Sequence, residues 1–215
     1  MAISTESLPP PGWDREGLDG LLNAFPKGRL SEIVGPRSSG GGSLLLALLA
    51  RAASRGGLVA LVDGADAFDP ETAVRAGLDL RALLWVRCGG RMASAWSAAD
   101  LLARCPGFAA VGLDLGTAWG TAWGTAPVAA PPSFGVRLQR AAAGNPAVVV
   151  VRAPRHVTGS AAALVVSVRR VRARWVGAPR RIRLGGVVSE ARVLRSRFDP
   201  RLAAPGRAWL IEWQA

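Results

Sequence analysis

The sequence has few of the residues that build metal sites and disulfide frameworks. It contains two cysteines, Cys88 and Cys105, and one histidine, His156. Their positions match no CxxC or mixed cysteine–histidine spacing, so we expect neither a zinc site nor a disulfide framework, and no other metal or cofactor is indicated. Two isolated thiols are typical of a protein from a reducing compartment, with one incidental disulfide as the alternative.

Long apolar runs are also missing. Residues 1–20 have no basic segment followed by an apolar one, so they do not resemble a signal peptide. The most apolar helical segment, residues 44–53, is far shorter than the roughly 20 residues that cross a bilayer. We therefore expect a cytoplasmic protein that does not enter a membrane.

The composition predicts a folded chain. Of its 215 residues, 50% are hydrophobic and 20% are charged, which is unlike a disordered protein. A chain of this size buries enough surface for one well-packed core. We expect a loosely held lead-in over residues 1–16, rich in proline and polar residues, followed by a single domain over residues 17–215.

Lysine is nearly absent, and the positive charge is concentrated in one quarter of the chain. Residues 152–207 contain fourteen arginines and two acids, whereas the remainder carries thirteen basic and thirteen acidic residues. Arginine pairs bidentately with phosphate, so this imbalance predicts contact with DNA, probably without sequence readout, and a solvated face is the alternative. The residues that we expect to contact DNA are Arg169, Arg170, Arg172, Arg174, Arg180, Arg181 and Arg183.

Apolar strand patterns alternate with helical patterns along the first 150 residues, which is typical of a parallel sheet. The expected strands cover residues 30–34, 58–62, 83–86, 109–115 and 147–151. The expected helices cover residues 43–55, 70–76, 93–103 and 134–143. The fold class is therefore α/β, with a largely parallel sheet flanked by helices.

Two later segments depart from this alternation. Residues 116–133 are a low-complexity loop with a repeated tetrapeptide, in which Trp119 and Trp123 are either contact residues or products of repeat expansion. Residues 152–207 form a basic extension, in which 162–174, 180–184 and 187–195 alternate apolar and basic side chains. This period of two predicts half-exposed antiparallel strands with arginine on one face.

A glycine-rich segment between the first strand and the first helix has the context of a phosphate-binding loop. The segment comprises Gly35, Pro36, Arg37, Ser38, Ser39, Gly40, Gly41, Gly42 and Ser43. Gly35 and Gly40 keep the spacing of the GxxxxGK[ST] motif, but Gly41 stands at the lysine position and Gly42 at the hydroxyl position. The backbone could still hold an anion, whereas the side chains for the β/γ-phosphates and magnesium are missing.

At this point the chain resembles RecA. The segment GRLSEIVGPRSSGGGS is similar to the opening of the RecA core, LVALVDGADAFDPETAVRAGLDLRALLWV to the RecA segment that follows it, and SEARVLRSRFDPRLAAPGRAWLIEW to the strand pair that ends that core. The resemblance runs from Gly17 to Trp213 and implies a RecA-like core that ends in antiparallel strands.

The same resemblance implies that catalytic groups have been lost. Ala65 stands where RecA has its catalytic glutamate, and Arg152 where RecA has a glutamine that senses the γ-phosphate. Asp114 resembles the Walker B aspartate, with capping of the following loop as its alternative role. Because phosphoryl transfer depends on positioning and charge stabilisation, these losses together predict a protein that does not hydrolyse ATP.

A RecA-like body with a degenerate phosphate loop also resembles the ImuA family of damage-induced mutagenesis accessory proteins. That resemblance implies a role in SOS-induced translesion synthesis. It also implies three partners: an ImuB-like inactive Y-family polymerase, an error-prone C-family polymerase and, in addition, RecA. The alternative is a divergent DNA-dependent ATPase or recombinase in which Arg37 replaces the missing lysine.

Overall fold

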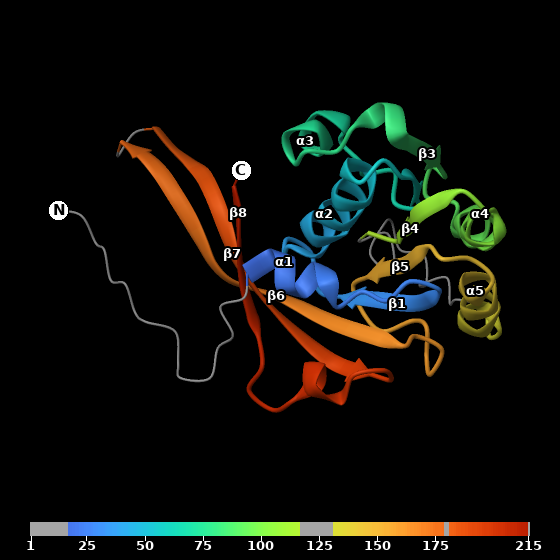
Figure 1. Cartoon of the computed structure of the whole chain (residues 1–215). Coiled ribbons are helices and arrows are strands. Elements are labelled where there is room, and N and C mark those ends of the chain that lie inside the picture. The colour runs from blue at the N-terminus through green and yellow to red at the C-terminus, as the bar shows by residue number, and fades with distance from the viewer. Residues whose placement is uncertain (1–16, 117–130, 179–180, 215) are drawn as a thin grey trace.

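One sheet organises the described part of the chain, which is residues 17–116, 131–178 and 181–214 of this computed structural model. The strand order is β3-β2-β4-β5-β1-β6-β7-β8 (Figure 1). The strands are β1 (Arg29–Val34), β2 (Leu58–Asp63), β3 (Leu83–Arg87), β4 (Phe108–Asp114), β5 (Val148–Ala153), β6 (Leu164–Ala178), β7 (Arg181–Ser196) and β8 (Trp209–Gln214). The strands from β3 to β6 in this order run parallel, and β7 is antiparallel to both β6 and β8.

Helices cover both faces of the parallel part of the sheet (Figure 1). One core packs α1, α2 and α3 against one face, and a second core packs α4 and α5 against the other. The helices are α1 (Gly17–Asn23), α2 (Gly41–Ser54), α3 (Pro70–Arg75), α4 (Met92–Arg104) and α5 (Phe134–Ala143), with short 3-10 turns η1 (Leu80–Ala82) and η2 (Pro200–Ala203). This arrangement confirms the expected α/β class, with antiparallel strands at its end.

The elements follow local sequence signals. Each residue of β2 after Leu58 is buried, as its unbroken apolar run predicts for a strand covered on both faces. Helix α2 is followed by Gly56 at a φ of 81°, a backbone conformation that glycine adopts without steric cost. Helix α3 begins with Pro70, and the Asp69 carboxylate caps it by accepting hydrogen bonds from the N–H groups of Glu71 and Thr72.

The basic extension forms two long strands where three were expected. Strand β6 runs parallel to β1 at its start and antiparallel to β7 for the rest of its length, and the two strands project beyond the body as a two-stranded ribbon (Figure 1). Gly185 and Gly186, which suggested a break between two strands, lie inside β7. Gly185 is the extra residue of a bulge opposite Arg174 and Trp175, so the strand continues through it.

No helix within the described ranges is long and apolar enough to cross a membrane. The longest, α2, has 14 residues and lies against the sheet.

Candidate functional site: a phosphate loop without its catalytic groups

The glycine-rich loop lies between β1 and α2, at the carboxyl edge of the parallel strands. Gly40 has a φ of 95°, and α2 begins at the next residue with Gly41 and Gly42 in its first turn. Parallel sheets bind ligands at this edge, where helix N-termini point backbone N–H groups outward. The loop thus keeps the backbone form of a phosphate loop without the two side chains that complete it.

The loop is attached to the antiparallel strands by a short chain of hydrogen bonds. The hydroxyl of Ser189, on β7, donates to the carbonyl oxygen of Ser39 at 2.7 Å and accepts from Nε1 of Trp213, on β8, at 3.1 Å. Ser189 is fully buried. A Cβ atom at Gly40 would lie 2.3 Å from the Ser189 hydroxyl oxygen, so only glycine fits here. The loop conformation is therefore held by residues that follow it by about 150 positions.

An ion pair occupies the carboxyl ends of β4 and β5, beside the loop. Nη1 of Arg152 lies 2.9 Å from Oδ1 of Asp114, and both side chains are largely buried. Asp114 also accepts a hydrogen bond from the Gly116 N–H at 2.7 Å, which is the capping role expected as its alternative. A Cβ atom at Gly41 would lie 3.6 Å from Nε of Arg152, so this guanidinium stands next to the position where a phosphate loop carries its lysine.

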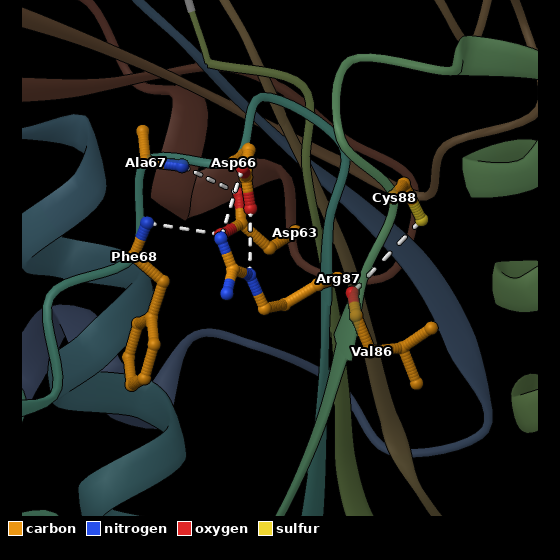
Figure 2. Close-up of polar contacts among 7 residues, drawn as sticks. All are labelled: Asp63, Asp66, Ala67, Phe68, Val86, Arg87 and Cys88. Carbon is orange, nitrogen blue, oxygen red and sulfur yellow. Dashed lines mark hydrogen bonds and ion pairs between the residues drawn. The ribbon is translucent and has the colours of Figure 1, made fainter.

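Neither acid near Ala65 is free to replace the missing glutamate. The buried Asp63 carboxylate accepts hydrogen bonds from the N–H groups of Ala67 and Phe68, both at 3.0 Å (Figure 2). Asp66 forms two hydrogen bonds with Arg87 at 2.8 and 3.0 Å (Figure 2). The hydrogen bond from Arg87 lowers the pKa of Asp66 below its ordinary value, which makes that carboxylate a weaker base.

The space around Ala65 is also filled. A Cβ atom at Gly116 would lie 2.3 Å from the Ala65 methyl group, so the turn after β4 packs directly against residue 65. A glutamate at this position has to move that turn or point elsewhere. The position of the lost base is thus closed in this structure as well as changed in sequence.

These residues do not fit a magnesium nucleotide, the ligand that the phosphate-loop context implies. Asp114 is the carboxylate best placed for the metal, and Arg152 already neutralises it. The hydroxyl that would complete the metal site is replaced by Gly42, and the Arg152 guanidinium lies beside Gly41. The backbone N–H groups at the start of α2 remain the only feature of the loop that suits an anion.

The predicted DNA contacts lie on the ribbon, where the structure divides them between its two faces. Arg169 pairs with the buried Glu190 at 2.7 Å and Arg174 with Glu212 at 3.0 Å, so these two are partly neutralised. The register places Arg172, Arg181 and Arg183 on that same face. All three are exposed, and none has an ion pair among the described residues.

Arg170 lies on the opposite face. It is paired in register with Ser189, whose side chain points to the phosphate loop. A bulge at Val171 causes this split, because it shifts the alternation by one residue. Arg180, Trp119 and Trp123 lie outside the described residues.

The face that carries Arg170 becomes apolar toward the end of the ribbon. Trp175 is directly opposite Leu184, and Gly177 is opposite Ile182. Trp175 and Ile182 are 64% and 60% exposed, and Leu184 is 37% exposed. The ribbon therefore presents arginine on one side and large apolar side chains on the other.

The sheet order, the helices on both faces and the phosphate-loop geometry define a RecA-like α/β protein. The sequence profile of the RecA N-terminal domain matches residues 17–114. The crystal structure of the RadB recombinase superposes with a TM-score of 0.58 at 20% identity, over 86% of this chain and 89% of RadB, which supports the fold alone.

Curated sequences agree over the N-terminal part. Protein RecA of Chlorobaculum parvum is 48% identical over 85 residues, which are 39% of this chain and 22% of that protein. Protein RecA of Agrobacterium fabrum is 47% identical over 63 residues, which are 29% of this chain and 17% of that protein. The matched segment thus spans about a fifth of the length of these RecA relatives.

Sequence reasoning missed the partners of the expected site residues. Asp114 and Arg152 both lie at the carboxyl ends of strands, and β4 and β5 are neighbours with these two residues directly in register. That common position was a usable signal for their ion pair. The Ser189 contact had no such signal, because it depends on how the antiparallel strands fold back onto the phosphate loop.

Proposed function

We propose that this protein is a RecA-like accessory factor that binds DNA and partner proteins without hydrolysing ATP. The observation that carries the proposal is the ion pair between Arg152 and Asp114. It places a fixed positive charge beside the degenerate phosphate loop and neutralises the carboxylate that a magnesium ion would need. The replacement of the catalytic glutamate by Ala65 points in the same direction.

A side chain that cannot leave is a substitute for a ligand that can. In an active phosphate loop, nucleotide and metal bring charge into the site and carry it away after hydrolysis, and this exchange drives conformational change. Here the charge of Arg152 is covalently attached and its salt bridge is largely buried. We infer that the site holds one state permanently, which suits assembly rather than turnover.

The DNA contacts are proposed for the arginine face of the ribbon. Arg172, Arg181 and Arg183 are exposed and have no acid to neutralise them, so phosphates can replace water around them. Phosphate contacts give affinity with little sequence readout. A role at damaged or stalled DNA, where sequence is arbitrary, is consistent with such binding.

The protein contacts are proposed for the opposite face. Trp175, Leu184 and Ile182 would bind an apolar segment of a partner while the arginine face remains on DNA. By resemblance to the ImuA family, the partners are an ImuB-like inactive Y-family polymerase and an error-prone C-family polymerase, with RecA as a further partner. The cellular process is then SOS-induced translesion synthesis in the cytoplasm.

ATP binding and hydrolysis by the purified protein, with and without single-stranded DNA, test the central claim. A matched variant carries Gly41→Lys, Gly42→Thr and Ala65→Glu, and a second variant adds Arg152→Gln to free Asp114. We expect no binding or turnover by the natural protein, and magnesium-dependent nucleotide binding only when Arg152 is also replaced. DNA-stimulated hydrolysis by the natural protein would refute the proposal and establish the divergent ATPase instead.

A further inference from the structure

A second cavity lies at the amino edge of the parallel strands, opposite the phosphate loop. It has a volume of about 480 Å³ and is bordered by α1, the segment leading into β1, the last turns of α2, and the starts of β4 and β5. Its apolar lining includes Leu22, Phe25, Leu48 and Val148. Cavities of this size and lining are typical of sites for small organic ligands.

Three cations stand around this apolar lining: Lys27, Arg51 and Arg55. Arg51 is held in place by Asp19 at 3.0 Å and by the side-chain oxygen of Asn23 at 2.5 Å. Lys27 and Arg55 are exposed, and neither forms an ion pair or a side-chain hydrogen bond within the described part of the chain. The cavity therefore combines an apolar interior with two free positive charges at its rim.

The charges and the cavity suit one chemistry better than others. An apolar ligand alone would leave the two free cations unused, and a bare anion such as phosphate would leave the apolar lining exposed to water. Helix α2 ends at the cavity, and its carbonyl groups repel anions weakly, but three side-chain charges outweigh that partial charge. The favoured ligand carries both an apolar body and one anionic group.

We propose that this cavity binds an amphipathic organic anion, with the apolar body against Leu48 and Phe25 and the anionic group at Lys27 and Arg55. The ligand is a free carboxylate or sulfonate of this shape, or the same chemistry on a peptide segment of a partner. The site is separate from both the phosphate loop and the arginine ribbon. It does not depend on the function proposed above.

The test is a fluorescence titration with 8-anilinonaphthalene-1-sulfonate, an apolar aromatic sulfonate. Lys27→Glu combined with Arg55→Glu is expected to weaken binding about tenfold or more, as the loss of charge-assisted hydrogen bonds predicts. Ala52→Phe keeps every cation and fills the cavity, and it is expected to weaken binding by a similar factor. Arg91→Glu, an exposed residue at the other edge of the sheet, is the control of equal charge change and should have no effect.

Competition identifies the chemistry. Decanoate is expected to displace the probe and decanol to displace it poorly, because only decanoate carries the anionic group. Stronger displacement by a synthetic acidic peptide ending in phenylalanine would assign the cavity to a partner segment, and weaker displacement would assign it to a free ligand. Equal displacement by decanoate and decanol, or unchanged probe binding in the Lys27 and Arg55 variant, would overturn the proposal.

Discussion

The division of the ribbon into two faces predicts how DNA affinity depends on salt. Replacing Arg172, Arg181 and Arg183 by glutamine removes three unpaired charges from one face. Each lost phosphate contact lowers the slope of log affinity against log salt by about 0.9 on duplex DNA and about 0.7 on a single strand. If all three contact phosphates, the slope falls by about 2.7 on duplex DNA or about 2.1 on a single strand.

This change in slope has a direct consequence for affinity. Between about 50 and 200 mM salt, a slope difference of about 2.7 means that the natural protein loses about fortyfold more affinity than the variant. Fluorescence anisotropy with labelled single-stranded and duplex oligonucleotides over that range measures both slopes. The drop in slope also distinguishes the two substrates, because it is larger on whichever DNA places more phosphates against the ribbon.

A control variant removes the same number of charges elsewhere. It replaces Arg91 and Arg140, which are exposed on the body, and Arg170, which lies on the apolar face of the ribbon. We expect its slope to match that of the natural protein. Equal slopes for both variants would show that net charge, rather than the arginine face, controls binding, and an unchanged slope in the first variant would remove DNA from this surface altogether.

Three further outcomes follow from the described contacts. Burial alone would raise the pKa of Glu190, but hydrogen bonds from two arginines lower it below its ordinary value, so its contribution to stability is present above the unfolded-state pKa and is lost as pH falls through the folded-state pKa. Glu190→Gln should therefore cost about 1–3 kcal/mol at pH 7 in thermal unfolding, and a difference that persists at acidic pH would contradict this reasoning. Ser189→Ala leaves the Ser39 carbonyl and the Trp213 indole N–H without their shared partner, and it should cost about 1–3 kcal/mol in chemical denaturation, with faster hydrogen exchange confined to the phosphate loop. Trp175→Asp should abolish copurification with the partner polymerases and leave DNA affinity unchanged, and loss of both would show that the two faces are not independent.

The sequence predicted most of the parallel body, because each of its strands and helices has a strong period or a distinct boundary. Helix α5 was predicted at its observed bounds, and β2 and β5 within two residues of theirs. Helix α1 was missed, since seven residues after a proline-rich segment give little periodicity. The long strand β7 was divided in two, because local reasoning treats Gly185 and Gly186 as a break and cannot foresee a bulge.

The site shows where local reasoning stops. The missing lysine, hydroxyl and glutamate are visible in the sequence, since each is a known position in a spaced motif. Which arginines share a face was not, because strict alternation would put Arg170 and Arg172 together and the bulge at Val171 separates them. The fixed charge of Arg152 also required the sheet order, since only neighbouring strands bring it to Asp114.

The dual pairing of β6 has a mechanical consequence. The same strand is hydrogen-bonded to β1 inside the body and to β7 in the projecting ribbon. Tension applied along the ribbon by a bound partner therefore loads the ladder between β6 and β1 in shear, so that its hydrogen bonds resist together instead of opening one after another. A moving enzyme could pull on the ribbon and transmit force to the strand that precedes the phosphate loop, with no hinge between them to absorb it.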